Sequence, residues 1–103
     1  MTKLTPIHPG EILDADFLSA MGISQSRLAR DIDVPFRRVN EICRGKRAIT
    51  ADTALRLARY FGMSAEYWMT LQARFEIESL KDRMTERLKR DIRPLRRERR
   101  AAA

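Results

Sequence analysis

Cations gather around one short segment of this 103-residue chain, PFRRVNEICRGKR at residues 35–47. Arg37 and Arg38 stand near the start of an apolar pattern formed by Val39 and Ile42, and further cations follow its end. A guanidinium group can donate two parallel hydrogen bonds, either to the O6 and N7 acceptors of guanine or to a phosphate. The segment therefore indicates contact with nucleic acid.

Side chains that could support catalysis are few. No base is placed to activate the single cysteine, Cys43, so we expect a small, partly buried residue there. The only histidine, His8, has no neighbouring metal ligands in the sequence, and we expect a structural role for it. No phosphate-binding loop or metal-ligand spacing occurs. We predict no enzyme activity, no catalytic residue, no metal and no cofactor.

The formal net charge of +7 is concentrated near the C-terminus. Residues 1–80 carry 11 Lys and Arg against 10 Asp and Glu, whereas residues 81–103 carry 10 against 4. A basic balance suits nucleic acid, an acidic membrane surface or an acidic protein. No apolar run approaches the roughly 20 residues that span a bilayer, and the N-terminus lacks an apolar signal core. With a single cysteine, these features predict a cytoplasmic protein that does not enter a membrane.

Glycine, proline and capping residues divide residues 9–76 into five predicted helices. No segment shows a convincing alternation of apolar and polar residues of the kind that strands have, so the predicted fold is all-α. Ser24, Thr50 and Ser64 are placed as N-caps, and Gly45 and Gly62 as stops. The helices run from Glu11 to about Ser19, over Gln25–Asp31, from Pro35 to Arg44, after Thr50 to about Phe61, and onward from Ser64. The apolar residues of the fourth are Leu55, Leu57, Ala58 and Phe61.

The second and third predicted helices are short and joined by a tight turn, which is the helix-turn-helix geometry. In that motif the N-terminal residues of the second helix meet base edges in the major groove, and flanking residues hold the phosphates. Asn40 suits adenine, Phe36 suits a thymine methyl group, and Glu41 either reads cytosine or, as we favour, pairs with an arginine one turn away. The predicted base contacts are Phe36, Arg37, Arg38, Asn40 and Glu41, and the predicted phosphate contacts are Ser24, Gln25, Arg44, Lys46 and Arg47.

The C-terminal third carries two apolar stripes with helical spacing. Trp68, Leu71 and Phe75 either complete the core of the chain or form a dimer seam. A second stripe continues along residues 77–93, which form either a frayed extension or a helix that binds a partner. Its residues are Ile77, Leu80, Met84, Leu88 and Ile92. The expected organisation is an N-terminal segment (1–10), a DNA-binding domain (11–76), an amphipathic extension (77–93) and a basic, disordered tail (94–103).

Two stretches of the sequence carry a family resemblance. SQSRLARDIDVPFRRVNEICRGKRAITADTALRLARYFGMSAEYWMTLQARFEIE resembles the five-helix Xre/Cro-type helix-turn-helix domain. Together with IHPGEIL, the run GKRAITADTALRLARYFGMSAEYWMTLQ resembles, more narrowly, HigA-type antitoxins. The resemblance covers roughly residues 7–78. Asp33 departs from it by replacing the usual turn glycine, and Val34-Pro35 replaces a hydroxyl-bearing cap.

The resemblance implies a dimeric repressor that binds operator DNA in its own operon and neutralises a small HigB-like toxin, usually an endonuclease that cleaves mRNA. It assigns Gln25 to a phosphate and the exposed positions from Phe36 to Glu41 to the bases. The toxin or the second subunit would then be the partner of the extension. The alternative is a free-standing Xre-type transcriptional regulator that has no toxin.

Overall fold

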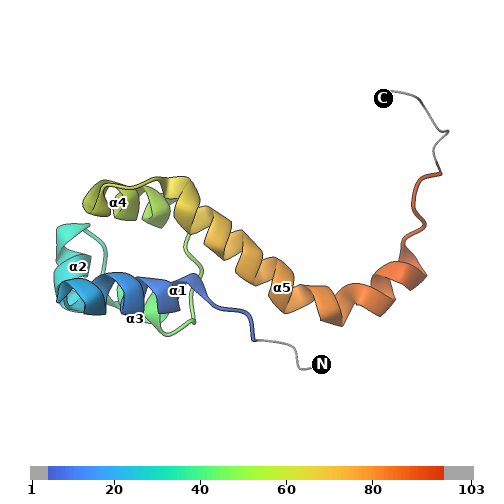
Figure 1. Ribbon diagram of the computed structural model, residues 1–103, viewed down its shortest axis with the longest axis horizontal. Coiled ribbons are helices and arrows are strands. Elements are labelled where there is room, and N and C mark those ends of the chain that lie inside the picture. The colour runs from blue at the N-terminus through green and yellow to red at the C-terminus, as the bar shows by residue number, and fades with distance from the viewer. Residues whose placement is uncertain (1–4, 97–103) are drawn as a thin grey trace.

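The computed structural model describes residues 5–96, and within this range every regular element is helical (Figure 1). A first helical segment consists of α1 (Pro9–Ile12) and the π-helical η1 (Leu13–Ser19). It is followed by α2 (Gln25–Asp31), α3 (Phe36–Cys43), α4 (Ala51–Phe61) and the long α5 (Ala65–Asp91). The predicted all-α, five-helix architecture is confirmed. None of these helices has the length and hydropathy needed to cross a membrane.

Local capping explains where most of the helices begin. The hydroxyls of Ser24, Thr50 and Ser64 each accept a hydrogen bond from the backbone N–H of the residue three positions later, at 3.0, 3.4 and 3.2 Å. The predicted start of α3 at Pro35 is wrong by one residue, because Pro35 has an extended ψ of 144° and lies outside the helix as its N-cap. Gly62 ends α4 in the left-handed conformation, as expected for a glycine stop.

The turn between α2 and α3 contains Asp33, whose φ of 59° is the only positive value of a non-glycine among residues 5–96. Asp33 therefore adopts the backbone that glycine adopts more easily. Arg56 of α4 supports the turn: its Nη1 donates to the carbonyl oxygens of Ile32 at 2.8 Å and Asp33 at 3.3 Å. The turn is thus held by a residue 23 or more positions away in the chain.

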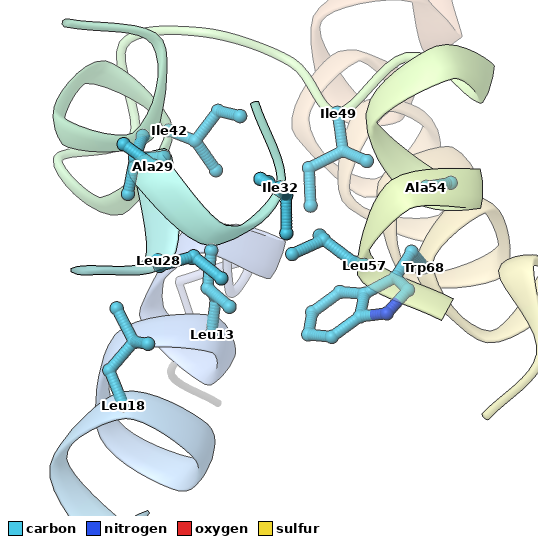
Figure 2. Close-up of a cluster of buried hydrophobic side chains, with 11 residues drawn as sticks. Leu13, Leu18, Leu28, Ala29, Ile32, Ile42, Ile49, Ala54, Leu57 and Trp68 are labelled. Atoms are coloured by element: carbon cyan, nitrogen blue, oxygen red, sulfur yellow. The ribbon is translucent and has the colours of Figure 1, made fainter. Parts of the chain in front are cut away.

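The core lies where all the helices meet, as Figure 2 shows. Trp68 is fully buried there, so of the two alternatives for its side chain, the core of the chain or a dimer seam, the structure places it in the core. Leu55 is 63% exposed, although Leu57 on the same helix is buried. Two residues correspond to a rotation of about 200° on a helix, so both cannot face the core. The buried apolar residues are Leu13, Leu18, Leu28, Ala29, Ile32, Val39, Ile42, Ile49, Ala54, Leu57 and Trp68.

The N-terminal segment is fastened to the end of α3 by His8 and Gly10. His8 is buried, and its Nδ1 accepts the Gly10 N–H at 2.8 Å, which caps α1 and starts it at Pro9 rather than Glu11. Gly10 packs so closely that a Cβ atom there would overlap the carbonyl oxygen of Ile42. The His8 ring also meets the ring of Phe75 edge-on, with centroids 4.7 Å apart. These contacts account for the predicted structural role of His8.

Helix α5 continues well past the other helices as one uninterrupted element (Figure 1). Its 27 residues give a length of about 40 Å at 1.5 Å per residue. The helix ends at Asp91, and residues 92–96 follow without regular structure. Part of the tail predicted to be disordered, residues 97–103, lies outside the described residues, as do residues 1–4 of the N-terminal segment.

Candidate nucleic-acid interface

The outer face of α3 presents most of the residues predicted to read bases. Val39 and Ile42 turn inward and are buried, while Arg37 is exposed and Phe36 is 50% exposed. Arg38 is half-buried. The backbone geometry therefore leaves the first turn of α3 accessible, as a recognition helix requires.

Glu41 joins the start of α3 to the loop that follows the helix. One carboxylate oxygen accepts from Arg37 Nε at 2.8 Å, and the other accepts from Arg47 Nε at 2.9 Å. The hydrogen bond from Arg37 and, after it, the bond from Arg47 lower the pKa of Glu41. The bond between Arg37 and Glu41 also raises the pKa of Arg37. The pairing of Glu41 with Arg37 is the alternative that the sequence favoured. Glu41 orients two of the cations predicted to contact DNA.

Arg38 is held by a different acid. Its Nη1 donates to Asp52 Oδ2 of α4 at 3.2 Å, and the same oxygen accepts from Arg56 Nε at 3.0 Å. The bond from Arg56, followed by the charges of Arg56 and Arg38, lowers the pKa of Asp52. Since Arg56 also supports the turn, one network joins α3, α4 and the turn of the motif. The Asp52–Arg56 spacing of four residues was visible in the sequence, but the contact from Arg38 was not.

Gln25, the first residue of α2, contacts α3 directly. Asn40 Nδ2 donates to Gln25 Oε1 at 3.0 Å, and both side chains are half-buried. Next to Gln25, the hydroxyl of Ser24 accepts the Arg27 N–H. The structure thus brings together a residue predicted to bind phosphate and one predicted to read a base.

The loop after α3 carries three exposed cations, Arg44, Lys46 and Arg47. Among residues 5–96, neither Arg44 nor Lys46 has an acidic partner within ion-pair distance, so both charges are available to an anion. Beside the loop, a polar hollow of about 440 Å³ reaches the start of α4. It is lined by Asp33, Arg38, Arg47, Ala48, Thr50, Asp52, Thr53 and Arg56.

The residues weighed for catalysis are not arranged for it. Burial raises the pKa of the Cys43 thiol to about 12, which keeps it in the protonated, weakly nucleophilic form. Burial also lowers the pKa of His8, whose ring is occupied by its contacts with Gly10 and Phe75. In the described part of the chain, no three His, Cys, Asp or Glu side chains gather as a metal site would require.

The two stripes of α5 differ in exposure. Leu71 and Phe75 are half-buried, and Leu71 lines a groove of about 590 Å³ between α5 and the segment that starts at Thr5. The second stripe faces solvent along the free part of the helix. Ile77, Leu80 and Leu88 are exposed and Met84 is half-buried. An unpaired apolar face of this kind is typical of a surface that binds a partner.

Comparisons with known proteins agree with this geometry. The helix-turn-helix family HTH_3 matches residues 18–68. Virulence-associated protein I of Dichelobacter nodosus is 47% identical over 76 residues, which cover 74% of this chain and 70% of that protein. Antitoxin HigA-1 of Vibrio cholerae is 32% identical over 88 residues, which cover 85% and 83% of the two chains.

A solved structure shows the same fold in the presence of DNA. The structure of Pseudomonas aeruginosa antitoxin HigA with the higBA promoter superposes with a TM-score of 0.84 at 43% identity, covering 88% of this chain and 99% of that one. The chain therefore belongs to the HigA-type antitoxins of the Xre-type helix-turn-helix family, a family of DNA-binding proteins and not of enzymes.

Proposed function

We propose that this protein is the antitoxin of a type II toxin–antitoxin module, a cytoplasmic homodimer that represses its own operon and neutralises a HigB-like, mRNA-cleaving toxin by direct binding. DNA binding is supported by the exposed start of α3 and by the unpaired cations Arg44 and Lys46 in the loop after it, in a fold that matches a HigA protein solved with its promoter. The toxin-binding half rests on family membership.

On operator DNA, α3 lies in the major groove and its first turn meets the base edges. Arg37 and Arg38 would exchange their carboxylate partners for guanine, while Phe36 meets a thymine methyl group. Arg44, Lys46, Arg47 and the start of α2 would hold phosphates on either side and so fix the register. Before DNA binds, Glu41 and Asp52 would restrict the side-chain conformations of Arg37 and Arg38, so fewer conformations are lost on binding.

A dimer is needed because one recognition helix reads only a few base pairs, too few to select one site among ~10⁶ or more in a genome. Helix α5 supplies a suitable surface. Ala73, Ile77, Leu80 and Met84 recur at spacings of four, three and four residues, which is the pattern of paired helices. Ile77 lies nine positions after Trp68, so at about 100° per residue the two lie on opposite sides of α5. One side of α5 thus completes the core, and the other is left for a second subunit or a toxin.

The toxin partner distinguishes this proposal from a free-standing regulator. We expect the product of the neighbouring gene to stop growth when expressed alone and to be tolerated when this chain is expressed with it. Co-purification of the two proteins tests direct binding. A neighbouring product that is harmless and does not co-purify would favour the free-standing regulator.

The DNA-binding half is tested by titrating a duplex from upstream of the protein's own gene against a scrambled duplex of equal length. We expect at least 10³-fold tighter binding of the upstream duplex at physiological salt. Equal affinity for the two duplexes would contradict autorepression.

A further inference from the structure

The loop after α3 carries the three cations that we propose as phosphate contacts, and its backbone is supported in two different ways. As far as Lys46, the support comes from α3 itself, because the Lys46 N–H donates to the Glu41 carbonyl oxygen at 2.8 Å. After Lys46, the loop leaves α3 and crosses to the start of α4. This second part is held by two buried side chains that lie far from it in the sequence, His8 and Gln72.

His8 holds the loop from the N-terminal side. Its Nδ1 accepts the Gly10 N–H at 2.8 Å, so the proton of the neutral ring is on Nε2 and is available to an acceptor. The ring forms its second hydrogen bond with the backbone of Arg47. The ring also lies against Gly45, since a Cβ atom built on that glycine would be 3.8 Å from the Cγ of His8. One side chain therefore ties the loop to the cap of α1.

Gln72 holds the same loop from α5. Its Oε1 accepts the backbone N–H of Ile49 at 2.8 Å, and its Nε2 donates to a carboxylate oxygen of Glu76, also at 2.8 Å. Both Gln72 and Ile49 are buried, so no water replaces the first of these bonds, and an Ile49 N–H left unpaired would be costly. The end of the loop is thus fixed to the long helix.

Three segments of the sequence that lie apart in the chain meet at this loop. IHPGEIL supplies His8, YWMTLQ supplies Gln72, and GKRAIT is the loop itself. Neither anchoring side chain is accessible enough to contact DNA, because His8 is 6% exposed and Gln72 is 4% exposed. Any effect of the two residues on DNA binding must therefore pass through the loop.

We propose that His8 and Gln72 are positioning residues for DNA binding: together they fix the course of the loop after α3, so that Lys46 and Arg47 lie where the phosphates pass. This inference rests on the proposed phosphate contacts of the loop. It adds that the affinity for DNA depends on two buried residues that lie outside the matched helix-turn-helix, residues 18–68.

Protonation of His8 should release the loop. A ring with a proton on Nδ1 cannot accept from Gly10, because two donors would face each other. Burial lowers the pKa of His8, while the charge of Glu11 and the hydrogen bond with the Arg47 backbone act in the opposite direction. From α5, the uncharged ring of Phe75 faces His8. The neutral form that holds the loop is therefore complete above pH 6.5 and is lost as the pH falls through the folded pKa.

His8→Asn separates the two hydrogen bonds of the ring. Asparagine is a good N-cap and can still accept from Gly10, but it is too short to reach Arg47 as well. We expect about three- to tenfold weaker binding of both the upstream duplex and the scrambled duplex at physiological salt, with the ratio of the two affinities unchanged. The slope of log affinity against log salt concentration should fall by about one phosphate contact.

The pH profile of DNA affinity distinguishes positioning from a merely structural role. His8 is the only histidine of the chain, and the phosphates of DNA keep their charge throughout this range. Between pH 7 and pH 5, we expect the affinity of the wild type for the scrambled duplex to fall about threefold or more, and that of His8→Asn to stay level. A ring that merely gained positive charge would have the opposite effect, because it would attract DNA.

Gln72→Met tests the second anchor. Methionine has a similar volume but removes the acceptor of the Ile49 N–H, so both duplexes should again bind more weakly, while the pH dependence due to His8 persists. Glu76→Gln is the matched control, because it changes the other partner of Gln72 and still offers that residue an oxygen. The control should keep the salt slope of the wild type. Circular dichroism and thermal unfolding show that each variant is folded.

The outcomes separate this inference from the proposed function. A wild type that binds the two duplexes equally would contradict autorepression and leave the loop contacts standing. A folded His8→Asn variant with the affinity, salt slope and pH profile of the wild type would overturn the positioning role alone, as would a wild-type affinity that rises at acid pH. A changed ratio of the two affinities with an unchanged slope would also overturn it, because the effect would then lie on α3.

Discussion

Replacing Asp33 by glycine should stabilise the protein. Asp33 has a φ of 59°, and left-handed backbone costs a residue with a Cβ about 1 kcal/mol, somewhat less for Asp. Glycine removes that strain but adds freedom to the unfolded chain, which returns roughly half of the gain. Within the described residues the Asp33 side chain forms no hydrogen bond that would be lost, and the bond from Arg56 goes to its backbone oxygen. The expected net gain is about 0.5 kcal/mol, or about 2–4 °C in Tm.

Gly62 offers the matched control. It has a φ of 70°, and no atom lies within 4 Å of the position that a Cβ would occupy. Gly62→Ala therefore introduces left-handed strain without a steric clash, and it should lower stability by about 0.5–1 kcal/mol. Urea unfolding of the wild type and the two variants, monitored by circular dichroism, measures both changes with the same chain and the same assay.

Suppose that Gly62→Ala is destabilised as expected but Asp33→Gly also loses stability. This result would refute the claim that backbone strain at Asp33 lowers the stability of the protein. It would mean that the charge of Asp33, next to the arginines of the polar hollow, contributes more than the backbone strain costs. An unchanged slope of unfolding free energy against urea is required in each case, because a changed slope would indicate an altered unfolded state.

Three further predictions follow from the arrangement of the site and the core. Arg37→Ala should relax base preference, whereas Lys46→Ala should weaken binding to all duplexes alike and reduce the salt dependence by about one phosphate contact, as titrations at several salt concentrations would show. Trp68→Ala should lower the free energy of unfolding by about 3–5 kcal/mol because the side chain is fully buried, while Ile77→Asp should leave a folded chain that light scattering finds monomeric. Because the folded pKa of His8 lies below 6.5, its contribution to stability is present above pH 6.5 and is lost as the pH falls through the folded value. His8→Asn, which can still accept from Gly10, should remove this part of the pH dependence in urea unfolding at pH 5–7.

Local patterns in the sequence were sufficient to predict the helices and their caps. The hydroxyls of Ser24, Thr50 and Ser64 act on backbone groups only three residues away, so the spacing alone identifies them. The left-handed turn at Asp33 could likewise be anticipated, because glycine is usual at that place in such motifs. The boundary at Pro35 failed because proline fixes φ and leaves ψ free, and ψ decides whether the residue belongs to the helix.

Contacts between distant segments could not be predicted in the same way. The pairing of Arg38 with Asp52 spans 14 residues and depends on how α4 packs against the motif. The position of Trp68 was equally undetermined, because an apolar stripe on a helix does not say whether it meets the same chain or another. The π-helical turns of η1 leave no mark in the 3.6-residue pattern from which that helix was predicted.

The fastening of residues 8–10 to the end of α3 has a consequence for genetics. Since Gly10 fits against the Ile42 carbonyl only because it lacks a side chain, the packing of α3, the proposed recognition helix, depends on a residue more than thirty positions earlier in the chain. Substitutions at Gly10 would therefore appear in a screen for repression defects beside those in α3, although Gly10 lies outside the predicted contacts with DNA. A map of such mutations would therefore include residues that hold α3 in position as well as residues of α3 itself.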